Sequence, residues 1–116
     1  WGPTLDTILR QAKENGKPVF LSFDVDVVDP AFIPGTSTPE PGGMYMREIL
    51  PTIRRMCHEL DVVGMEIVEL RPERDPAYTS VQNSKAVLRQ CLNGLAMAKR
   101  GFPDDYINPE ILDDGK

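Results

Sequence analysis

The sequence has few cysteines, a deficit of basic charge and no long apolar run, and each shortage excludes a class of protein. Two cysteines among 116 residues argue against a disulfide framework. Both Cys57 and Cys91 fall on apolar helical positions, where a free buried thiol is ordinary. No apolar stretch approaches the roughly 20 residues that a membrane helix needs. We therefore expect no membrane association and a reducing, cytoplasmic location.

The charge balance excludes a general binder of nucleic-acid backbones. Lys and Arg together number 13 against 18 Asp and Glu, which gives a formal net charge of −5, whereas such a binder needs a basic face. The excess of acid is local, because residues 104–116 hold five acidic side chains against Lys116 alone. We interpret this segment as an acidic tail and expect no nucleic-acid partner.

Apolar spacing predicts three helices and two strands. Apolar residues at i, i+3, i+4 and i+7 indicate amphipathic helices. The expected helices span residues 4–15, 46–60 and 81–100. Pro51 removes a backbone donor early in the second of these and predicts a kink or a late start. Nearly continuous apolar runs over 18–26 and 61–70 are typical of parallel strands that are covered on both faces.

The order of these elements describes an incomplete α/β domain. A strand, a helix and a second strand form a β-α-β unit, and further helices flank it. Two parallel strands alone make a thin sheet with exposed edges. We therefore expect residues 1–116 to form a single partial domain, the edge portion of a larger doubly wound sheet.

Two aspartates at the end of the first strand are the sharpest chemical feature. Side chains two apart on a strand point to the same face, so Asp24 and Asp26 are expected to project together where open α/β sheets bind ligands. Neighbouring carboxylates repel unless they are protonated or bridged by a cation, and a hard ion such as Mn²⁺ or Mg²⁺ suits them. One alternative is a loop cap beside a solvated acid. Another is the metal-bound nucleotide-sugar site that glycosyltransferases build from D-x-D.

The long loop that follows favours a more specific interpretation. Residues 27–43 carry four prolines and three glycines, which can hold a loop in a defined shape. The run SFDVDVVDPAFIPGTSTPEPGG resembles the late signature of the ureohydrolases, the arginase and agmatinase superfamily, and the resemblance continues through GMEIVELRP. It implies a three-layer α/β/α fold with a parallel sheet, of which this chain contains only the C-terminal part.

The resemblance also implies an activity and a set of site residues. Ureohydrolases hold two Mn²⁺ ions, or Ni²⁺ in a few members, and hydrolyse a guanidinium group to urea and an amine. Matching positions make Asp24 and Asp26 metal ligands, Glu69 the partner of the substrate guanidinium and Thr38 the support of Glu69. A linear substrate such as agmatine, guanidinobutyrate or guanidine is implied, as is a homo-oligomer, a trimer or hexamer.

Other residues either depart from the family pattern or take ordinary roles. Asp29 is expected to form a turn rather than bind metal, and His58, the single histidine, is expected to be a partly exposed helix residue rather than a metal ligand. Glu66 and residues 70–75 differ from the usual agmatinase sequence pattern. The group at the far end of the substrate from its guanidinium is therefore left open.

The chain also lacks part of the family's site. The G-G-D-H and D-A-H-x-D segments that bring the remaining metal ligands are absent, and so is the family's catalytic histidine. No catalytic residue is therefore identified, and this chain alone is expected to be inactive. A second interpretation follows, in which the chain is a ureohydrolase remnant that acts as a binding or assembly subunit.

Overall fold

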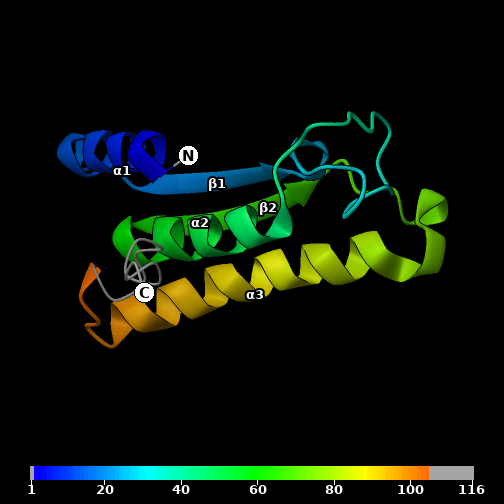
Figure 1. The fold of residues 1–116 in the computed structure, drawn as a ribbon. Coiled ribbons are helices and arrows are strands. Elements are labelled where there is room, and N and C mark those ends of the chain that lie inside the picture. Colours follow the sequence, from blue (N-terminus) through cyan, green and yellow to red (C-terminus); the bar gives the residue numbers. More distant parts are fainter. Residues whose placement is uncertain (1, 105–116) are drawn as a thin grey trace, which may run out of the picture.

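A computed structural model describes residues 2–104 and confirms the predicted order of elements (Figure 1). The main elements are α1 (Gly2–Asn15), β1 (Val19–Asp24), α2 (Met46–Glu59), β2 (Val62–Val68) and α3 (Thr79–Lys99). Three short 3₁₀ turns join them, namely η1 (Val25–Val27), η2 (Pro72–Arg74) and η3 (Pro76–Tyr78). The proposed acidic tail lies outside the described residues, apart from Asp104. None of the helices in the described part of the chain is long and apolar enough to cross a membrane.

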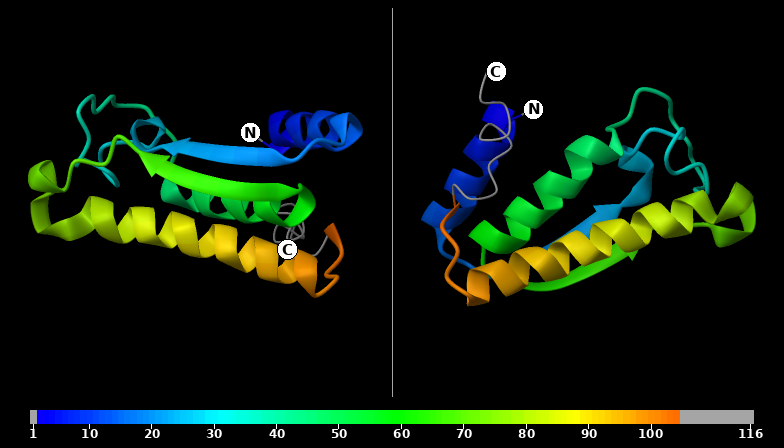
Figure 2. Two further views of the ribbon diagram at one scale, coloured as in Figure 1. Left: turned by 180° about the vertical axis from the view of Figure 1, so that it is seen from behind. Right: turned by 60° about the horizontal axis from the view of Figure 1, so that its bottom comes forward.

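The two strands pair in parallel, as predicted, and α2 makes the connection between them. Figures 1 and 2 show α2 and α3 lying together across one face of this sheet. The core between them is made of apolar side chains that are buried or nearly so: Phe23, Val25, Val28, Ile33, Met46, Ile49, Ile53, Cys57, Val87 and Cys91. The other face carries the exposed side chains of Phe20, Ser22 and Glu66. The α2–α3 layer therefore covers one face of the β1–β2 pair.

Helix α2 does not begin late, although a late start was one of the two outcomes expected from Pro51. The helix begins at Met46, five residues before the proline, so the late start is wrong. Glu48 helps to fix this start, because its Oε2 accepts the backbone N–H of Tyr45 at 2.7 Å. A proline inside a helix removes the hydrogen bond that its own nitrogen would donate, and its ring crowds the carbonyl of residue i−4. The apolar stripe of α2 outweighs that loss.

Helices α2 and α3 approach closely, and two details of the sequence make this possible. A Cβ atom on Gly94 would lie 2.4 Å from the carbonyl oxygen of Arg54, so only glycine fits at that point of α3. Cys57 and Cys91 are both buried and free, as predicted, and their Sγ atoms are 2.8 Å apart. Burial and the neighbouring thiol raise the pKa of Cys57, which keeps it protonated.

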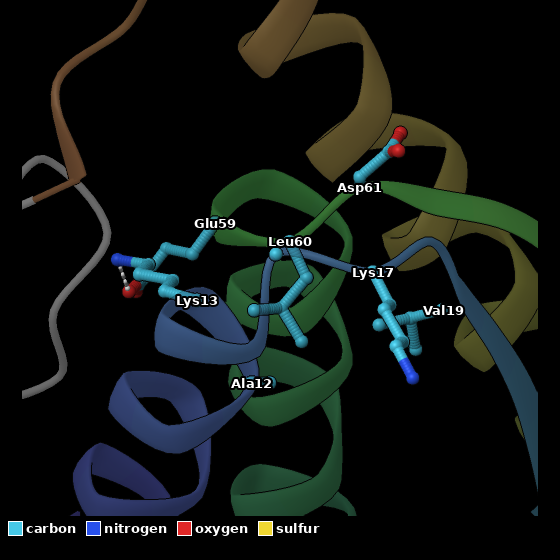
Figure 3. A pocket seen from close by; sticks show the side chains of 8 residues that line it. Ala12, Lys13, Lys17, Val19, Glu59, Leu60 and Asp61 are labelled. Atoms are coloured by element: carbon cyan, nitrogen blue, oxygen red, sulfur yellow. Dashed lines mark hydrogen bonds and ion pairs between the residues drawn. The ribbon is translucent and has the colours of Figure 1, made fainter.

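Helix α1 is attached to α2 by apolar and ionic contacts. Leu5 and Leu9 are buried against Leu60. A pocket of about 170 Å³ lies beside this contact, where Lys13 on α1 meets Glu59 on α2 (Figure 3). The pocket is at the amino-terminal ends of the strands, since Val19 and Asp61 line it. It is therefore remote from the carboxyl ends of the strands.

Candidate functional site

The predicted acidic side chains gather where β1 and β2 end. Asp24 is the last residue of β1 and pairs in register with Val68, the last residue of β2, so Glu69 follows at the same edge. Asp24 and Glu69 are both exposed there. Desolvation raises the pKa of Asp24, and the neighbouring carboxylates of Asp26 and Glu69 raise it further. The three carboxyl groups are therefore close enough to repel one another.

The route by which Asp24 and Asp26 come together differs from the prediction. They do not share a strand face, because β1 ends at Asp24 and Asp26 lies in η1. A 3₁₀ turn has three residues per turn, so the strand period of two no longer applies. Asp24 caps this turn, and its Oδ1 accepts the backbone N–H of Asp26 at 3.1 Å. The two carboxyl groups still lie close together, because Asp26 is among the groups that raise the pKa of Asp24.

Thr38 contacts a different carboxylate from the one that the resemblance implies. Its Oγ1 donates to Oδ2 of Asp26 at 2.6 Å. A hydroxyl carries one proton, so Thr38 has none left to donate to Glu69 in this arrangement. In this structure the hydroxyl of Thr38 supports Asp26, and its support of Glu69 stays a prediction. No local pattern signals this contact, because the two residues are 12 positions apart and a largely irregular loop joins them.

The loop after η1 is held in shape by Asp29. Its Oδ1 accepts the N–H of Ala31 and its Oδ2 accepts the N–H of Gly42, both at 2.9 Å. These two backbone donors lower the pKa of Asp29. Gly43 allows the two ends of the loop to meet, since a Cβ there would lie 2.6 Å from the backbone nitrogen of Asp29. Asp29 is thus a turn-forming acid, as predicted.

The P-G-T-S-T-P turn is joined to the segment that follows β2. Thr36 forms an isolated antiparallel bridge with Leu70, and the N–H of Arg71 donates to the carbonyl of Gly35 at 2.7 Å. The N–H of Gly35 in turn donates to Oγ of Ser80, a fully buried residue near the start of α3, at 2.7 Å. Sequence reasoning did not identify Ser80, although a serine at a helix start is a recognised sign of such contacts. These bonds fix Thr38 and Glu69 in one loop assembly.

Glu69 has a backbone conformation that residues other than glycine rarely adopt. Its φ is +64°. A non-glycine residue in this left-handed region costs about 1–3 kcal/mol, and such residues cluster at functional sites. The strained geometry places the Glu69 carboxylate beside Asp24, at the edge where the strands end.

Residues 1–93 match the arginase family. The chain belongs to the arginase family. Among its relatives, guanidinobutyrase from Pseudomonas aeruginosa is 42% identical over 77 residues, which cover 65% of this chain and 24% of the relative. An agmatinase from Photorhabdus laumondii is 36% identical over 99 residues, which cover 84% of this chain and 32% of the relative. The chain thus spans a quarter to a third of these relatives.

The solved structures confirm an arginase-like α/β fold with a parallel sheet. Formimidoylglutamase from Bacillus subtilis superposes with a TM-score of 0.78 at 31% sequence identity. The match covers 83% of this chain and 30% of that structure. The described elements are therefore part of a larger arginase-family fold.

The residues of this arginase-family chain fit part of a metal site. Asp24 and Asp26 offer hard carboxylate oxygens, which suit divalent ions such as Mn²⁺ or Mg²⁺. Desolvation and then the neighbouring Asp26 raise the pKa of Asp24, and a bridging cation relieves the repulsion between two such carboxylates. Within residues 2–104, however, no three side chains of His, Cys, Asp or Glu converge as metal ligands. The described part of the chain therefore offers a divalent cation two ligands, and further ligands are needed to complete its coordination shell.

The single histidine takes no part in this group. His58 lies in α2, and its buried imidazole Nε2 is 3.3 Å from the carbonyl oxygen of Pro103. His58 is a helix residue, as expected, but the expected partial exposure is wrong, because its side chain is buried between α2 and the segment after α3.

Proposed function

We propose that the protein to which this chain belongs hydrolyses a linear guanidino compound to urea and an amine with the help of divalent metal. In this proposal Asp24 and Asp26 bind metal, and Glu69 binds the guanidinium group of the substrate. One observation carries the proposal: at the carboxyl edge of β1 and β2, in a chain of the arginase family, Asp26 and Glu69 lie close enough to Asp24 to raise its pKa. Agmatine, guanidinobutyrate and guanidine are the candidate substrates.

The proposed reaction balances with water as the second reactant. Water adds to the guanidinium carbon, the bond from that carbon to the substituted nitrogen breaks, and this nitrogen leaves with the extra protons. R–NH–C(NH₂)₂⁺ and H₂O thus give R–NH₃⁺ and urea. Divalent metal, when bound, makes hydroxide available near neutral pH. The planar donors of the guanidinium match a carboxylate such as Glu69, which lies beside Asp24 and would hold the carbon in place.

Thr38 is a positioning residue in this proposal. Its hydroxyl fixes one oxygen of Asp26 at 2.6 Å, while Asp24 is fixed by the backbone N–H of Asp26 at 3.1 Å. Hydrogen bonds of this kind orient metal ligands, and their removal typically costs tenfold to a hundredfold in metal affinity or activity. The proposal also includes Mn²⁺ or Ni²⁺ as the metal, a homo-oligomer and a cytoplasmic location, which the resemblance to ureohydrolases supports.

Two substitutions in the full-length protein test the proposal. Asp26→Asn removes a charged ligand, so both metal content and urea release are expected to fall at least tenfold. Glu69→Gln keeps the ligands and removes the guanidinium partner, so metal content is expected to stay near normal while KM for the substrate rises. Metal is measured by mass spectrometry and urea by a colorimetric assay on a panel of guanidino compounds.

Glu40→Gln is the matched control, because Glu40 is an exposed acid of the same loop. It is expected to change neither metal content nor KM. If Asp26→Asn keeps full metal content, or Glu69→Gln keeps the normal KM, the corresponding residue does not have its proposed role.

A second candidate function is assembly without catalysis, and one observation favours it. The described residues provide no complete group of three metal ligands, so a protein of this composition could serve as a partner subunit. Urea release separates the two candidates, because an assembly subunit yields none with any metal or guanidino compound.

A further inference from the structure

We propose that Arg71 recognises a carboxylate at the far end of the substrate, so that the protein prefers guanidino acids to guanidino amines. This inference rests on the proposed function, because it assumes that Glu69 holds the guanidinium end. Arg71 is two residues beyond Glu69 in the segment that follows β2.

The position of Arg71 is fixed relative to the acidic group. Its backbone N–H donates to the carbonyl of Gly35 at 2.7 Å, and its Nη1 donates to Oγ of Ser37 at 3.1 Å. Ser37 directly precedes Thr38, whose hydroxyl donates to Asp26. Consecutive Cα atoms are about 3.8 Å apart, so this chain of contacts keeps the guanidinium of Arg71 within a distance on the order of 10 Å from the carboxylate of Asp26. A short linear substrate spans that distance.

The guanidinium of Arg71 is not paired with Asp24, Asp26 or Glu69. Arg71 instead pairs through Nε with Glu73 at 2.6 Å, and both side chains of this pair are about half exposed, at 46% and 59%. Exposed pairs of this kind contribute little to stability, so a ligand carboxylate can replace Glu73 at little cost.

The arrangement therefore has opposite charges at its two ends. Glu69 and the aspartates form an anionic end that suits a guanidinium, and Arg71 forms a cationic end. A guanidinium fork binds a carboxylate through two parallel hydrogen bonds. A substrate with an amine at its far end would meet like charge at Arg71. The preferred class is thus a guanidinium and a carboxylate joined by a short alkyl chain.

The test compares two substrates in the full-length, metal-loaded protein. The probes are 4-guanidinobutyrate, which ends in a carboxylate, and agmatine, which ends in an amine. Arg71→Ala is expected to lower kcat/KM for 4-guanidinobutyrate about tenfold to a hundredfold and to leave agmatine unchanged or improved. Arg71→Glu is expected to lower the ratio of kcat/KM for 4-guanidinobutyrate to kcat/KM for agmatine still further. Arg71→Lys is expected to keep part of the wild-type preference for 4-guanidinobutyrate. Arg74→Ala, which removes an exposed arginine of the same turn, is the control and is expected to leave the ratio unchanged.

The outcomes distinguish this inference from the function on which it rests. An equal loss for both substrates in Arg71→Ala would show that Arg71 only clamps Ser37, and it would overturn the inference. A wild-type protein that hydrolyses agmatine or guanidine but not guanidino acids would overturn it as well, with the proposed function intact. A wild-type protein that releases urea from no guanidino compound would overturn both.

Discussion

At the scale of single residues, the site combines strain with repulsion. Glu69 adopts a left-handed backbone conformation, and desolvation together with the neighbouring carboxylates of Asp26 and Glu69 raises the pKa of Asp24. Both features cost folding free energy and neither contributes to the core. Sites that bind ligands commonly keep such costs, because the ligand offsets them.

Glu69→Gly separates the two roles of this residue. Glycine adopts a φ of +64° without a Cβ penalty, so the metal-free protein is expected to gain about 1 kcal/mol of unfolding free energy. Urea release is expected to fall to background, because the carboxylate that is proposed to bind guanidinium is gone. Urea denaturation and the urea-release assay provide the two measurements. Glu69→Gln is the control and should lose substrate binding without gaining stability. A less stable Glu69→Gly variant would mean that the backbone at this position is not strained.

At the scale of elements, α1 is attached to the rest of the chain by an ionic network centred on Glu59. This carboxylate accepts Nζ of Lys13 at 2.8 Å and Nε of Arg55 at 2.7 Å, and its side chain is only 4% exposed. Arg55 also reaches Asp6 on α1 at 2.8 Å. The network therefore joins α1 to α2 at two points, in addition to the contact of Leu5 and Leu9 with Leu60.

Glu59→Gln is expected to weaken the docking of α1 on α2. Removing one member of a buried ion pair typically costs about 3–5 kcal/mol, and we expect the lower end because Arg55 keeps Asp6 and Lys13 keeps Asp104. Urea denaturation measures the loss, and faster amide exchange along α1 locates it. Glu14→Gln is the matched control, since Glu14 forms an exposed pair with Arg10 and should change stability by less than about 0.5 kcal/mol. Equal effects of the two substitutions would show that the network does not hold α1.

The sequence predicts the helices and strands better than it predicts the side-chain contacts of the candidate site. Apolar runs and helical stripes are local signals, so β1, β2 and α3 were found close to their observed bounds. The end of β1 was placed two residues late, because Val25 continues the apolar run although the backbone already turns there. The bonds from Thr38 to Asp26 and from Arg71 to Ser37 join residues 12 and 34 positions apart. Such contacts depend on how two irregular loops pack, which no periodicity records.

At the scale of the whole molecule, the described chain leaves apolar surface uncovered. Phe20 is 61% exposed, Val63 is 65% exposed and Leu92 is 58% exposed. Val63 and Leu92 also line an apolar groove between β2 and α3. Single exposed apolar residues are normal, whereas a contiguous apolar patch marks a surface that contacts another polypeptide. Since the relatives and solved structures described above are three to four times as long as the matched part, such surfaces are where the rest of an arginase-family fold would pack.

The 116-residue chain is therefore expected to associate with itself when it is produced alone. A two-stranded sheet is marginal in water, and its open edges and apolar groove favour contact between copies. Sedimentation velocity over a hundredfold range of concentration should show a rising average mass. Phe20→Ser combined with Leu92→Ser should reduce that rise, whereas Ile8→Ser should not, because Ile8 is 40% exposed on α1 and away from the groove. A chain that stays monomeric throughout would show that this surface does not drive association. A chain whose association survives the double substitution would place the contact elsewhere.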